Sequence, residues 1–422
     1  MRNFIILSIV AVMILLSGCA RKIEIEPGRI VYVDDDFETE ADSDGSEYAP
    51  YHSLQEAIDS AWSGDRIFLM PGIYSAEADE YVDSLCGNCL EHRTLAHATV
   101  GFHIKDKQLT IEGFERDSVR LLTNAGYGVL FENCPSSRIS NLTISGGKRD
   151  LDGNATDAAV VVKFSEVTVE NCTIIDNEHK LDTVVVGIGG VFGREGAQII
   201  VRNNLIKNNS WDAIALYRGA KAFIADNEID KGRGVGIGIT WDAHAVVTRN
   251  LISNYWKGIG TFGNSSAVVT NNIVFDNLGW GIIATGNSFM EARNNNIVRN
   301  GNCGFAAWSD SARGVVINNI IADNGWREKW VCPCVGVWMN GDPENFRIEY
   351  NDVWGNDSAE YRDIDDLTGQ FGNLSVDPMF VDSLDFHLRD NSPLYNAGHP
   401  YYTDPDGGRS DIGAFGGLGG IK

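Results

Sequence analysis

Acidic and basic side chains that could move protons gather between residues 218 and 257. An elimination beside a sugar carboxylate needs a group that neutralises the carboxylate and a base that removes the adjacent proton, roles that Lys, Arg, His and Tyr commonly fill. The candidates for catalysis are Arg218, Lys221, Arg233, Asp242, His244 and Lys257. A solvated charged surface also explains each of them taken singly.

Hydrolysis of a glycosidic bond needs a different arrangement, with two carboxyl groups on opposite sides of the bond. The nearest pairing of this kind is Asp212 with Asp242. Whether the chain is an enzyme is therefore left open, and a polysaccharide lyase and a glycoside hydrolase are the two types considered.

Aromatic side chains recur in the same region and could stack on sugar rings. The candidates for carbohydrate binding are Trp211, Tyr217, Trp256, Phe262, Trp280 and Trp308. Because side chains alternate between the two faces of a strand, the column that contains Tyr217, Phe262 and Trp308 is expected to face solvent. Trp280 and Trp308 are expected to expose their rings along a groove. Alternatively, the aromatic residues only shield the flank of the fold.

Oxygen ligands at alternate positions around a glycine are typical of calcium loops. The stretch that contains Asp150, Asp152, Asn154 and Asp157 has this pattern, and Asp404, Asp406 and Asp411 repeat it near the end of the chain. Neither stretch has the full twelve-residue pattern, so Ca²⁺ is the one cofactor considered and none is required.

The cysteines favour disulfides over metal binding. Cys86, Cys89 and His92, with His97, have the ligand types of a zinc site, but in an exported chain a disulfide between the two cysteines is favoured. Cys303 falls close to Cys334 and Cys332 on neighbouring repeats, so a bridge to either of them is plausible if the geometry permits.

The catalytic and aromatic candidates lie in a part of the chain where asparagines recur at a nearly fixed period. The row is Asn204, Asn227, Asn250, Asn272, Asn295, Asn319 and Asn351, with spacings of 23, 23, 22, 23, 24 and 32 residues. Such a period indicates stacked units that bury a face only against their neighbours. Asn tolerates a left-handed corner, and its amide can bond to the Asn of the next unit about 4.8 Å away. We expect a structural ladder that begins at Asn204.

Each unit has three short strands. In the unit from Ala267 they are residues 267–270, 273–275 and 281–284. Near the N-terminus, Ser53 and Glu56 predict a capping box for a helix with Leu54, Ala57, Ile58 and Ala61 on one face.

The repeats over roughly residues 30–375 resemble the pectin-lyase-like right-handed parallel β-helix superfamily, an all-β solenoid with an N-terminal capping helix. The resemblance implies that a substrate would lie along the strand after the variable loop. The Asn-Thr-Asp, Gly-His-Gly and Arg-Ile-Lys motifs of the polygalacturonase branch and the Asp-Pro-His-Asp of alginate epimerases are absent, which weakens the enzyme hypothesis. Residues 376–422, from Asp377-Pro378 to Ala414-Phe415, resemble the C-terminal closing module of bacterial surface β-helix proteins.

The first residues predict export and lipid anchoring. Residues 1–18 have a basic start and an apolar run, and Leu16-Ser17-Gly18-Cys19 resembles a bacterial lipobox, which implies lipidation at Cys19. Residues 19–29 would then be a tether to the membrane of the cell envelope. The net charge of −24 disfavours nucleic acid as a partner.

The leading hypothesis is a monomeric, lipid-anchored envelope protein that binds, and in one version cleaves, a polysaccharide along the solenoid groove. A non-catalytic structural or adhesion protein is the alternative. A third hypothesis, a periplasmic accessory that resembles the β-helix protein of copper-enzyme maturation, is weakened because few His and Met residues line the groove.

Overall fold

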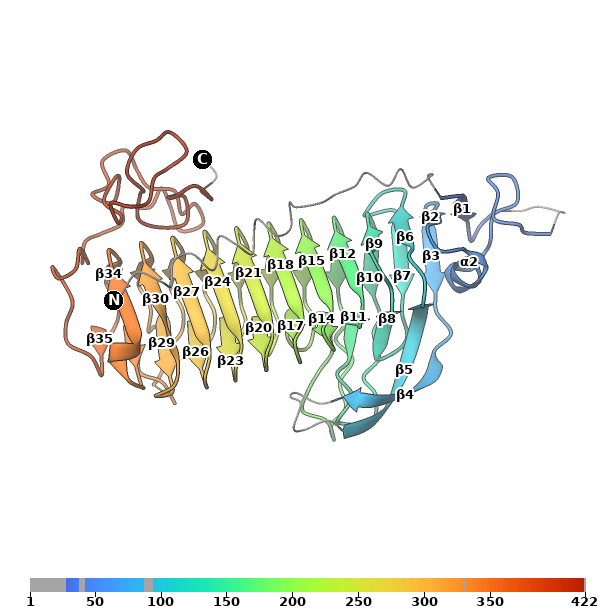
Figure 1. Cartoon of the computed structure of the whole chain (residues 1–422), viewed down its shortest axis with the longest axis horizontal. Helices are drawn as coiled ribbons and strands as arrows, with labels where there is room; N and C mark the ends of the chain where they lie inside the picture. Colours follow the sequence, from blue (N-terminus) through green and yellow to red (C-terminus); the bar gives the residue numbers. More distant parts are fainter. Residues whose placement is uncertain (1–27, 38–41, 87–93, 330, 421–422) are drawn as a thin grey trace, which may run out of the picture.

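The computed structural model describes residues 28–37, 42–86, 94–329 and 331–420, which wind repeatedly around one long axis (Figure 1). Each regular coil contributes one short strand to each of three sheets, and strands of successive coils pair in parallel. Their inward apolar side chains form one core that runs from Val31 to Tyr361. The predicted parallel β-helix is thus confirmed, since each coil buries its apolar residues against the next.

The chain enters each coil through sheet 3, turns into sheet 1 and then into sheet 2. Sheet 1 consists of β1 (Ile30–Val33), β2 (Arg66–Leu69), β6 (Thr110–Gly113), β9 (Ser137–Ser140), β12 (Glu166–Glu170), β15 (Gln198–Arg202), β18 (Lys221–Ala225), β21 (His244–Thr248), β24 (Ser266–Thr270), β27 (Phe289–Arg293), β30 (Arg313–Ile317) and β33 (Phe346–Glu349). Sheet 2 consists of β3 (Gly72–Ser75), β7 (Val119–Leu122), β10 (Thr143–Ser145), β13 (Thr173–Ile175), β16 (Leu205–Lys207), β19 (Glu228–Asp230), β22 (Leu251–Ser253), β25 (Ile273–Phe275), β28 (Asn296–Val298), β31 (Ile320–Ala322) and β34 (Asp352–Trp354).

Sheet 3 carries the one hairpin among the described strands, between β4 and β5, which pair antiparallel. The sheet consists of β4 (Asp79–Cys86), β5 (Thr94–Lys105), β8 (Tyr127–Glu132), β11 (Ala158–Lys163), β14 (Gly189–Arg194), β17 (Ile214–Leu216), β20 (Val235–Thr240), β23 (Lys257–Phe262), β26 (Trp280–Thr285), β29 (Phe305–Trp308), β32 (Val335–Met339) and β35 (Ala359–Arg362). A 3₁₀ turn, η2 (Pro343–Asn345), precedes β33. The three strands predicted for the coil from Ala267 correspond to β24, β25 and β26, so the period-2 alternation located them well.

The predicted asparagine ladder lies at the corner between sheets 1 and 2. The Asn250 side-chain amide donates to Asn272 Oδ1 at 2.9 Å, and the same oxygen accepts the Asn250 backbone N–H at 3.0 Å. The bonds repeat from coil to coil, begin at Asn204 and extend beyond the predicted row to Asn373. Since every amide in the buried column is partnered, the ladder fixes the register of the coils.

The sequence suggested that the ladder asparagine itself adopts the left-handed conformation at this corner, and this prediction is wrong. The left-handed conformation belongs to the residue before it, such as Asn271 with φ 58° and Arg249 with φ 54°. The ladder asparagines themselves point inward in ordinary conformations, and their role is hydrogen bonding.

A second asparagine ladder, at the corner between sheets 2 and 3, was not predicted. Asn177 donates to Asn209 at 2.8 Å, and a further run links Asn277, Asn300, Asn324 and Asn356. Between the two runs, Gly232 and Tyr255 replace asparagine, and a Cβ on Gly232 would lie 2.2 Å from the Tyr255 ring.

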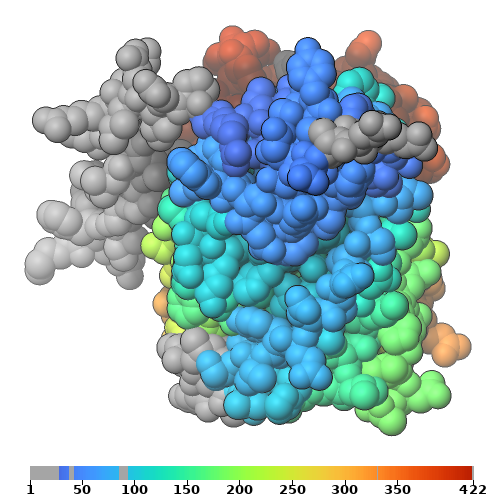
Figure 2. Space-filling model, turned by 90° about the vertical axis from the view of Figure 1, so that its right-hand side faces the viewer, coloured from blue at the N-terminus to red at the C-terminus, as the bar shows by residue number. Residues whose placement is uncertain are grey.

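The N-terminal end of the core is covered by α2 (Leu54–Ser60), whose Leu54, Ala57 and Ile58 are buried. Figure 2 shows the blue N-terminal residues covering that end of the solenoid. Ser53 occupies the N-cap position, but its side chain makes no capping hydrogen bond, so that half of the predicted capping box is not formed. In the described part of the chain, no helix is both long and apolar enough to cross a membrane.

Residues 376–420 fold back beside the last coils, at the upper left of Figure 1. Leu394 and Ile412 pack with Ile320 and Ala322 on the outer face of sheet 2. The left-handed corner residues Asn271 and Asn294 bind this segment through their side-chain amides.

Candidate functional site

The outer face of sheet 3 presents three columns of side chains. The columns are named in the order in which the chain runs along each strand. The first column contains Asp212, Val235, Lys257, Trp280 and Cys303; the middle column contains Phe192, Ala215, Gly238, Gly260 and Ile283; and the last column contains Tyr217, Thr240, Phe262, Thr285 and Trp308. These positions lie outside the main core.

Two apolar clusters cover much of this face. The outer N-terminal cluster includes Phe192, Ala215 and Tyr217. The hairpin β4–β5 packs over this part of the sheet, and Asp83 on β4 forms ion pairs with Lys163 and Arg194. The outer C-terminal cluster comprises Trp280, Ile283, Cys303, Ala306, Cys332, Val335 and Trp338. Between the clusters the middle column contains the two glycines.

At one of these glycines there is room for a small side chain, although the glycine itself is buried. A Cβ placed on Gly238 would have Val235 Cβ at 3.8 Å and Asp212 Oδ2 at 4.0 Å as its nearest neighbours. By contrast, a Cβ on Gly260 would lie 2.6 Å from the Phe262 ring, which leans over it. We call the space outside Gly238 the Gly238 hollow, with Asp212 and Val235 at its edge and Lys257 on the next strand.

Asp212 is the most perturbed carboxyl group at the Gly238 hollow. The residue is 9% exposed, and its Oδ1 accepts the Val235 backbone N–H at 2.7 Å. Burial raises the pKa of Asp212 to about 6, and this rise outweighs the opposing effects of the Val235 N–H and the Lys257 charge. Asp212 can therefore exchange a proton near neutral pH.

Lys257 occupies the same column, with Val235 between it and Asp212. Its ammonium lies over the Trp280 ring, 5.3 Å from the centroid. Burial lowers the pKa of Lys257, and the Asp212 charge partly opposes this. An acid with a raised pKa beside an amine with a lowered one is typical of proton-transfer sites.

Tyr255 lies in the interior behind this region, at the break in the second ladder. The side chain is fully buried, and its hydroxyl has no hydrogen-bond partner among the described residues. Burial, together with the Asp212 charge, raises the Tyr255 pKa. The break in the ladder thus lies next to groups with shifted pKa values, where departures from a repeating pattern are expected to be functional.

The remaining catalytic candidates do not come together. Arg218 was expected beside the groove, but it is buried in an ion pair with Glu195, so that expectation of exposure is wrong. Lys221 and His244 are exposed at the start of β18 and β21 on sheet 1, one corner away from the hollow. Arg233 is exposed in the loop before β20.

Asp242 lies in the corner after β20, with φ 64°. It cannot form a hydrolase pair with Asp212. Asp212 aligns with Val235, and the chain from Val235 to Asp242 spans roughly 20 Å. Glycosidase carboxyl groups lie only about 5 to 9.5 Å apart.

The tryptophans contact one another more than they face solvent. Trp280 is 2% exposed, so the prediction that its ring lines an open groove is wrong. It stacks on Trp308 at 5.6 Å and meets Trp256 edge-on at 6.0 Å, under the loop that precedes β32. Tyr217, in the column expected to face solvent, is also covered, at 7% exposure.

The other aromatic candidates are half-buried. Trp211 packs against the outer N-terminal cluster, and Trp256, Phe262 and Trp308 pack against the outer C-terminal cluster. Trp211 and Trp256 precede the aligned residues Asp212 and Lys257 and therefore flank the hollow on its two sides.

The proposed calcium loop does not fit a cation. Asp150 accepts from the Thr99 N–H and hydroxyl, Asp152 from the His97 and Asn154 N–H groups, and Asp157 from Arg149. Their oxygens are thus directed at separate donors. Among the described residues no cluster of three or more His, Cys, Asp or Glu side chains could hold a metal ion.

The second acidic stretch is also engaged by backbone groups. Asp404 accepts the Gly417 N–H, Asp406 the Gly408 N–H and Asp411 the Asn396 N–H. Cys19, Cys89 and His92 lie outside the described residues, and the side chain of Cys86 is not described.

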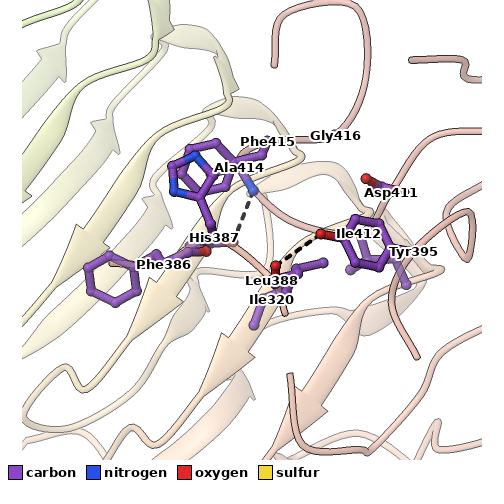
Figure 3. A pocket seen from close by; sticks show the side chains of 11 residues that line it. Ile320, Phe386, His387, Leu388, Tyr395, Asp411, Ile412, Ala414, Phe415 and Gly416 are labelled. Carbon is purple, nitrogen blue, oxygen red and sulfur yellow. Dashed lines mark hydrogen bonds between the residues drawn. The ribbon is translucent and has the colours of Figure 1, made fainter. Parts of the chain in front are cut away.

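A second hollow, of about 250 Å³, lies between the C-terminal segment and sheet 2. Figure 3 shows His387 stacked on Phe415 at one side and Tyr395, whose hydroxyl donates to the Leu388 carbonyl, at the other. The stacked rings and the Tyr395 bond lie within the C-terminal segment, and the Ala414 N–H donates across the interface to Asn296 of sheet 2. Because these lining groups already hold the C-terminal segment together and against the sheet, we place the candidate site at the Gly238 hollow.

Comparison with known proteins agrees with this architecture. The profile of the family described as "Right handed beta helix region" matches residues 86–252 and 189–353. The chain belongs to this family. The superfamily resemblance is thus confirmed, although no curated protein matches the sequence.

Solved structures resemble this right-handed β-helix. The A-module of the Azotobacter vinelandii mannuronan C-5 epimerase AlgE4 is 14% identical, with 82% of this chain and 97% of that chain covered and a TM-score of 0.50. The pectate lyase Pel9A is 15% identical, with 92% and 96% covered and a TM-score of 0.46. The lacto-N-biosidase of Eubacterium ramulus is 14% identical, with 80% and 68% covered and a TM-score of 0.44. At these identities the likeness is one of fold.

Proposed function

We propose that this β-helix binds a polysaccharide at the Gly238 hollow and transfers protons to and from it. The observation that carries the proposal is the presence of Asp212 and Lys257, with pKa values shifted in opposite directions, beside Gly238, where an added Cβ would meet no atom closer than 3.8 Å. The fold likeness to a mannuronan C-5 epimerase module supports a uronate polymer as the first probe.

The proposed chemistry is proton removal from the carbon beside a uronate carboxylate. The Lys257 ammonium neutralises the carboxylate, and the ionised Asp212 takes the proton. Cleavage of the bond to the neighbouring glycosidic oxygen, with protonation of that oxygen, would then give a lyase, and delivery of a proton from water to the opposite face of the carbanion would give an epimerase. The rate is expected to rise as pH passes through about 6, because Asp212 acts as a base only when ionised.

The open stretch of the outer face is short. It is confined to Gly238, because Ala215 belongs to the outer N-terminal cluster and the Phe262 ring leans over Gly260. The outer clusters cover the sheet on both sides, so the hollow suits a short segment of polymer, with Trp211 and Trp256 as its flanking aromatic residues.

The test is a panel of polyuronates and neutral glycans. Ultraviolet absorbance detects unsaturated lyase products, NMR detects epimerised residues, and calorimetry detects binding. Lys257→Ala is expected to abolish turnover, and Gly238→Val to abolish binding by filling the hollow. Arg313→Ala, exposed on sheet 1, is the control that should leave both unchanged.

Absence of binding to every polymer would refute the proposal and favour the non-catalytic structural or adhesion protein. That alternative rests on the stacked, largely covered tryptophans, which stabilise the flank of the solenoid without a ligand. Binding without turnover would support recognition but refute the role of Asp212 and Lys257 in proton transfer.

Export, and lipid anchoring at Cys19 to the bacterial envelope, also belong to the proposal, and the lipobox supports them. Cys19→Ala is expected to release the protein from the membrane fraction. Unchanged membrane association of the variant would count against the anchor. A monomer in detergent-free solution of a form that begins at residue 28 is the expected oligomeric state.

A further inference from the structure

Three cysteines meet at the C-terminal side of the candidate site. Cys303 is in the first column of sheet 3, and Cys332 and Cys334 are in the loop between β31 and β32. Cys303 and Cys332 are completely buried in the outer C-terminal cluster, together with Trp280 and Trp338.

The side-chain contacts distinguish the two possible partners of Cys303. Cys303 and Cys332 belong to one packed cluster that does not include Cys334, and the Cys332 side chain adds to burial in raising the pKa of the Cys303 thiol. The Cys334 sulfur is engaged elsewhere, since it donates to the Arg327 carbonyl at 3.0 Å and receives the Asn302 amide at 3.7 Å. Of the two possible partners, Cys332 is therefore the one that packs with Cys303.

The loop that carries Cys332 reaches back over earlier coils towards the Gly238 hollow. The Arg327 guanidinium lies 4.8 Å from the centroid of the Trp256 ring and donates to the Leu278 carbonyl at 3.1 Å. The Trp326 ring nitrogen donates to the Arg299 carbonyl at 2.6 Å. Trp256 immediately precedes Lys257, so this loop buttresses one flank of the hollow.

We propose that Cys303 and Cys332 form a disulfide that clamps this loop in place and so fixes the Trp256 flank of the Gly238 hollow. The two thiols lose two protons and two electrons, and one S–S bond forms. A dithiol oxidant in its disulfide state, or oxidised glutathione, accepts them and becomes two thiols. Cys334 remains a thiol and holds the Arg327 carbonyl.

The two isolated thiols elsewhere provide a comparison. Cys134 and Cys172 are fully buried in the main core, and each donates to carbonyl oxygens of its own or a neighbouring coil. Neither has a second sulfur among its bonded partners in the described structure, so both are expected to stay reduced.

The first experiment maps the bond. The full chain is produced by secretion into an oxidising compartment, its free thiols are alkylated in denaturant without reductant, and the linked peptides are identified by mass spectrometry. The link is expected in the wild type, Cys334→Ser and Cys172→Ser, and not in Cys303→Ser or Cys332→Ser. Fully alkylated cysteines in the wild type, or a link that disappears in Cys334→Ser, would overturn the proposal.

The second experiment tests the clamp. Reductant is expected to lower the thermal midpoint of the wild type and Cys334→Ser by several degrees and to leave Cys303→Ser unchanged. Reduction should also speed tryptic cleavage after Arg327 severalfold, while cleavage after Arg362 in β35 serves as the internal reference. A linked protein whose melting and cleavage do not respond to reductant would refute the clamp. Both readouts are independent of any polysaccharide, so they stand even where the proposed function fails.

Discussion

Asp212 departs from the rule that this fold otherwise follows, as does the buried Asp352 in β34. Inward positions of the coils hold apolar side chains and partnered asparagines, and the outward acidic residues of sheet 1, such as Glu170, form ion pairs with arginines. Asp212 instead is 9% exposed and is bonded to one backbone N–H. A carboxylate held this way reduces the stability of the folded chain at neutral pH, which is characteristic of a functional group rather than a structural one.

Replacing Asp212 should therefore stabilise the protein. The pKa of Asp212 in the folded chain, about 6, lies above the ordinary 3.8. Its contribution to the free energy of unfolding is therefore fully present below about pH 4 and is lost as pH rises through 6. The loss is at most about 3 kcal/mol. Asp212→Asn keeps an acceptor for the Val235 N–H, so at neutral pH its free energy of unfolding should exceed that of the wild type. Chemical denaturation at about pH 4 and about pH 7.5 measures the difference.

Asp230→Asn is the matched control with the opposite sign. Hydrogen bonds from Lys207 and Asn254 hold the Asp230 pKa below its usual range despite partial burial, so its stabilisation is present at neutral pH and is lost as the solution becomes acidic. Asp230→Asn should destabilise at neutral pH. An Asp212→Asn variant that is less stable than the wild type at both pH values would mean that this carboxylate is structural.

At the scale of the elements, the tight corner between sheets 1 and 2 has two asparagine positions with separate tasks. The ladder residue Asn295 points inward and bonds to Asn272 and Asn319. The residue before it, Asn294, points outward and donates to the Asp411 and Gly413 carbonyls of the C-terminal segment. The paired asparagines thus hold the coil from inside and dock the C-terminal segment from outside.

Asn294→Gly should separate these tasks. Glycine tolerates the φ of 52° at this position, so the bonds lost are those to the C-terminal segment and one long bond of 3.5 Å from the Asn318 amide. Proteolysis of residues 376–420 is expected to accelerate, while the unfolding free energy of the solenoid changes little. The counterpart Asn295→Ala leaves the buried Asn272 backbone N–H without its acceptor, while the Asn272 side-chain amide keeps the Val247 and Thr270 carbonyls, and it should cost the solenoid about 1 to 3 kcal/mol. Equal effects of the two variants on both measurements would contradict this division.

The elements show what could be predicted and what could not. Ladder register and strand positions follow from a period that every coil repeats, so β24, β25 and β26 were located from the sequence. The second ladder was missed because Gly232 and Tyr255 interrupt its period. Burial of Trp280 depends on the loop before β32, which belongs to a coil two turns further on, and alternation within one strand carries no information about such cover.

The candidate site was predicted only in part, for the same reason. The sequence located the site on the outer face of sheet 3 and named Lys257. Arg218, which it also named, is instead buried in an ion pair with Glu195 from the preceding coil. Asp212 was considered only as a hydrolase partner. Its raised pKa comes from burial by neighbouring coils and loops, a contact that no local pattern reveals.

At the scale of the whole molecule, the net charge of −24 acts against the proposed ligand. A polyuronate approaching this chain meets long-range repulsion, while attraction comes only from a few local cations near the Gly238 hollow, Lys257, Arg233 and Arg327. Salt screens interactions beyond the Debye length, which falls from about 20 Å to about 7 Å between roughly 20 and 200 mM. Distant repulsion is therefore removed first, and contacts within the hollow persist.

This balance predicts an unusual salt dependence. The association rate with a polyuronate, measured by surface-immobilised polymer or stopped flow, should rise between roughly 20 and 200 mM NaCl, and the rate with a neutral glycan should stay constant. Lys257→Ala should weaken binding at both salt concentrations without reversing the trend, because the repulsion arises from the whole molecule. A rate that instead fell with salt would contradict this prediction. It would mean that attraction of the polymer by the local cations outweighs its repulsion by the acidic solenoid.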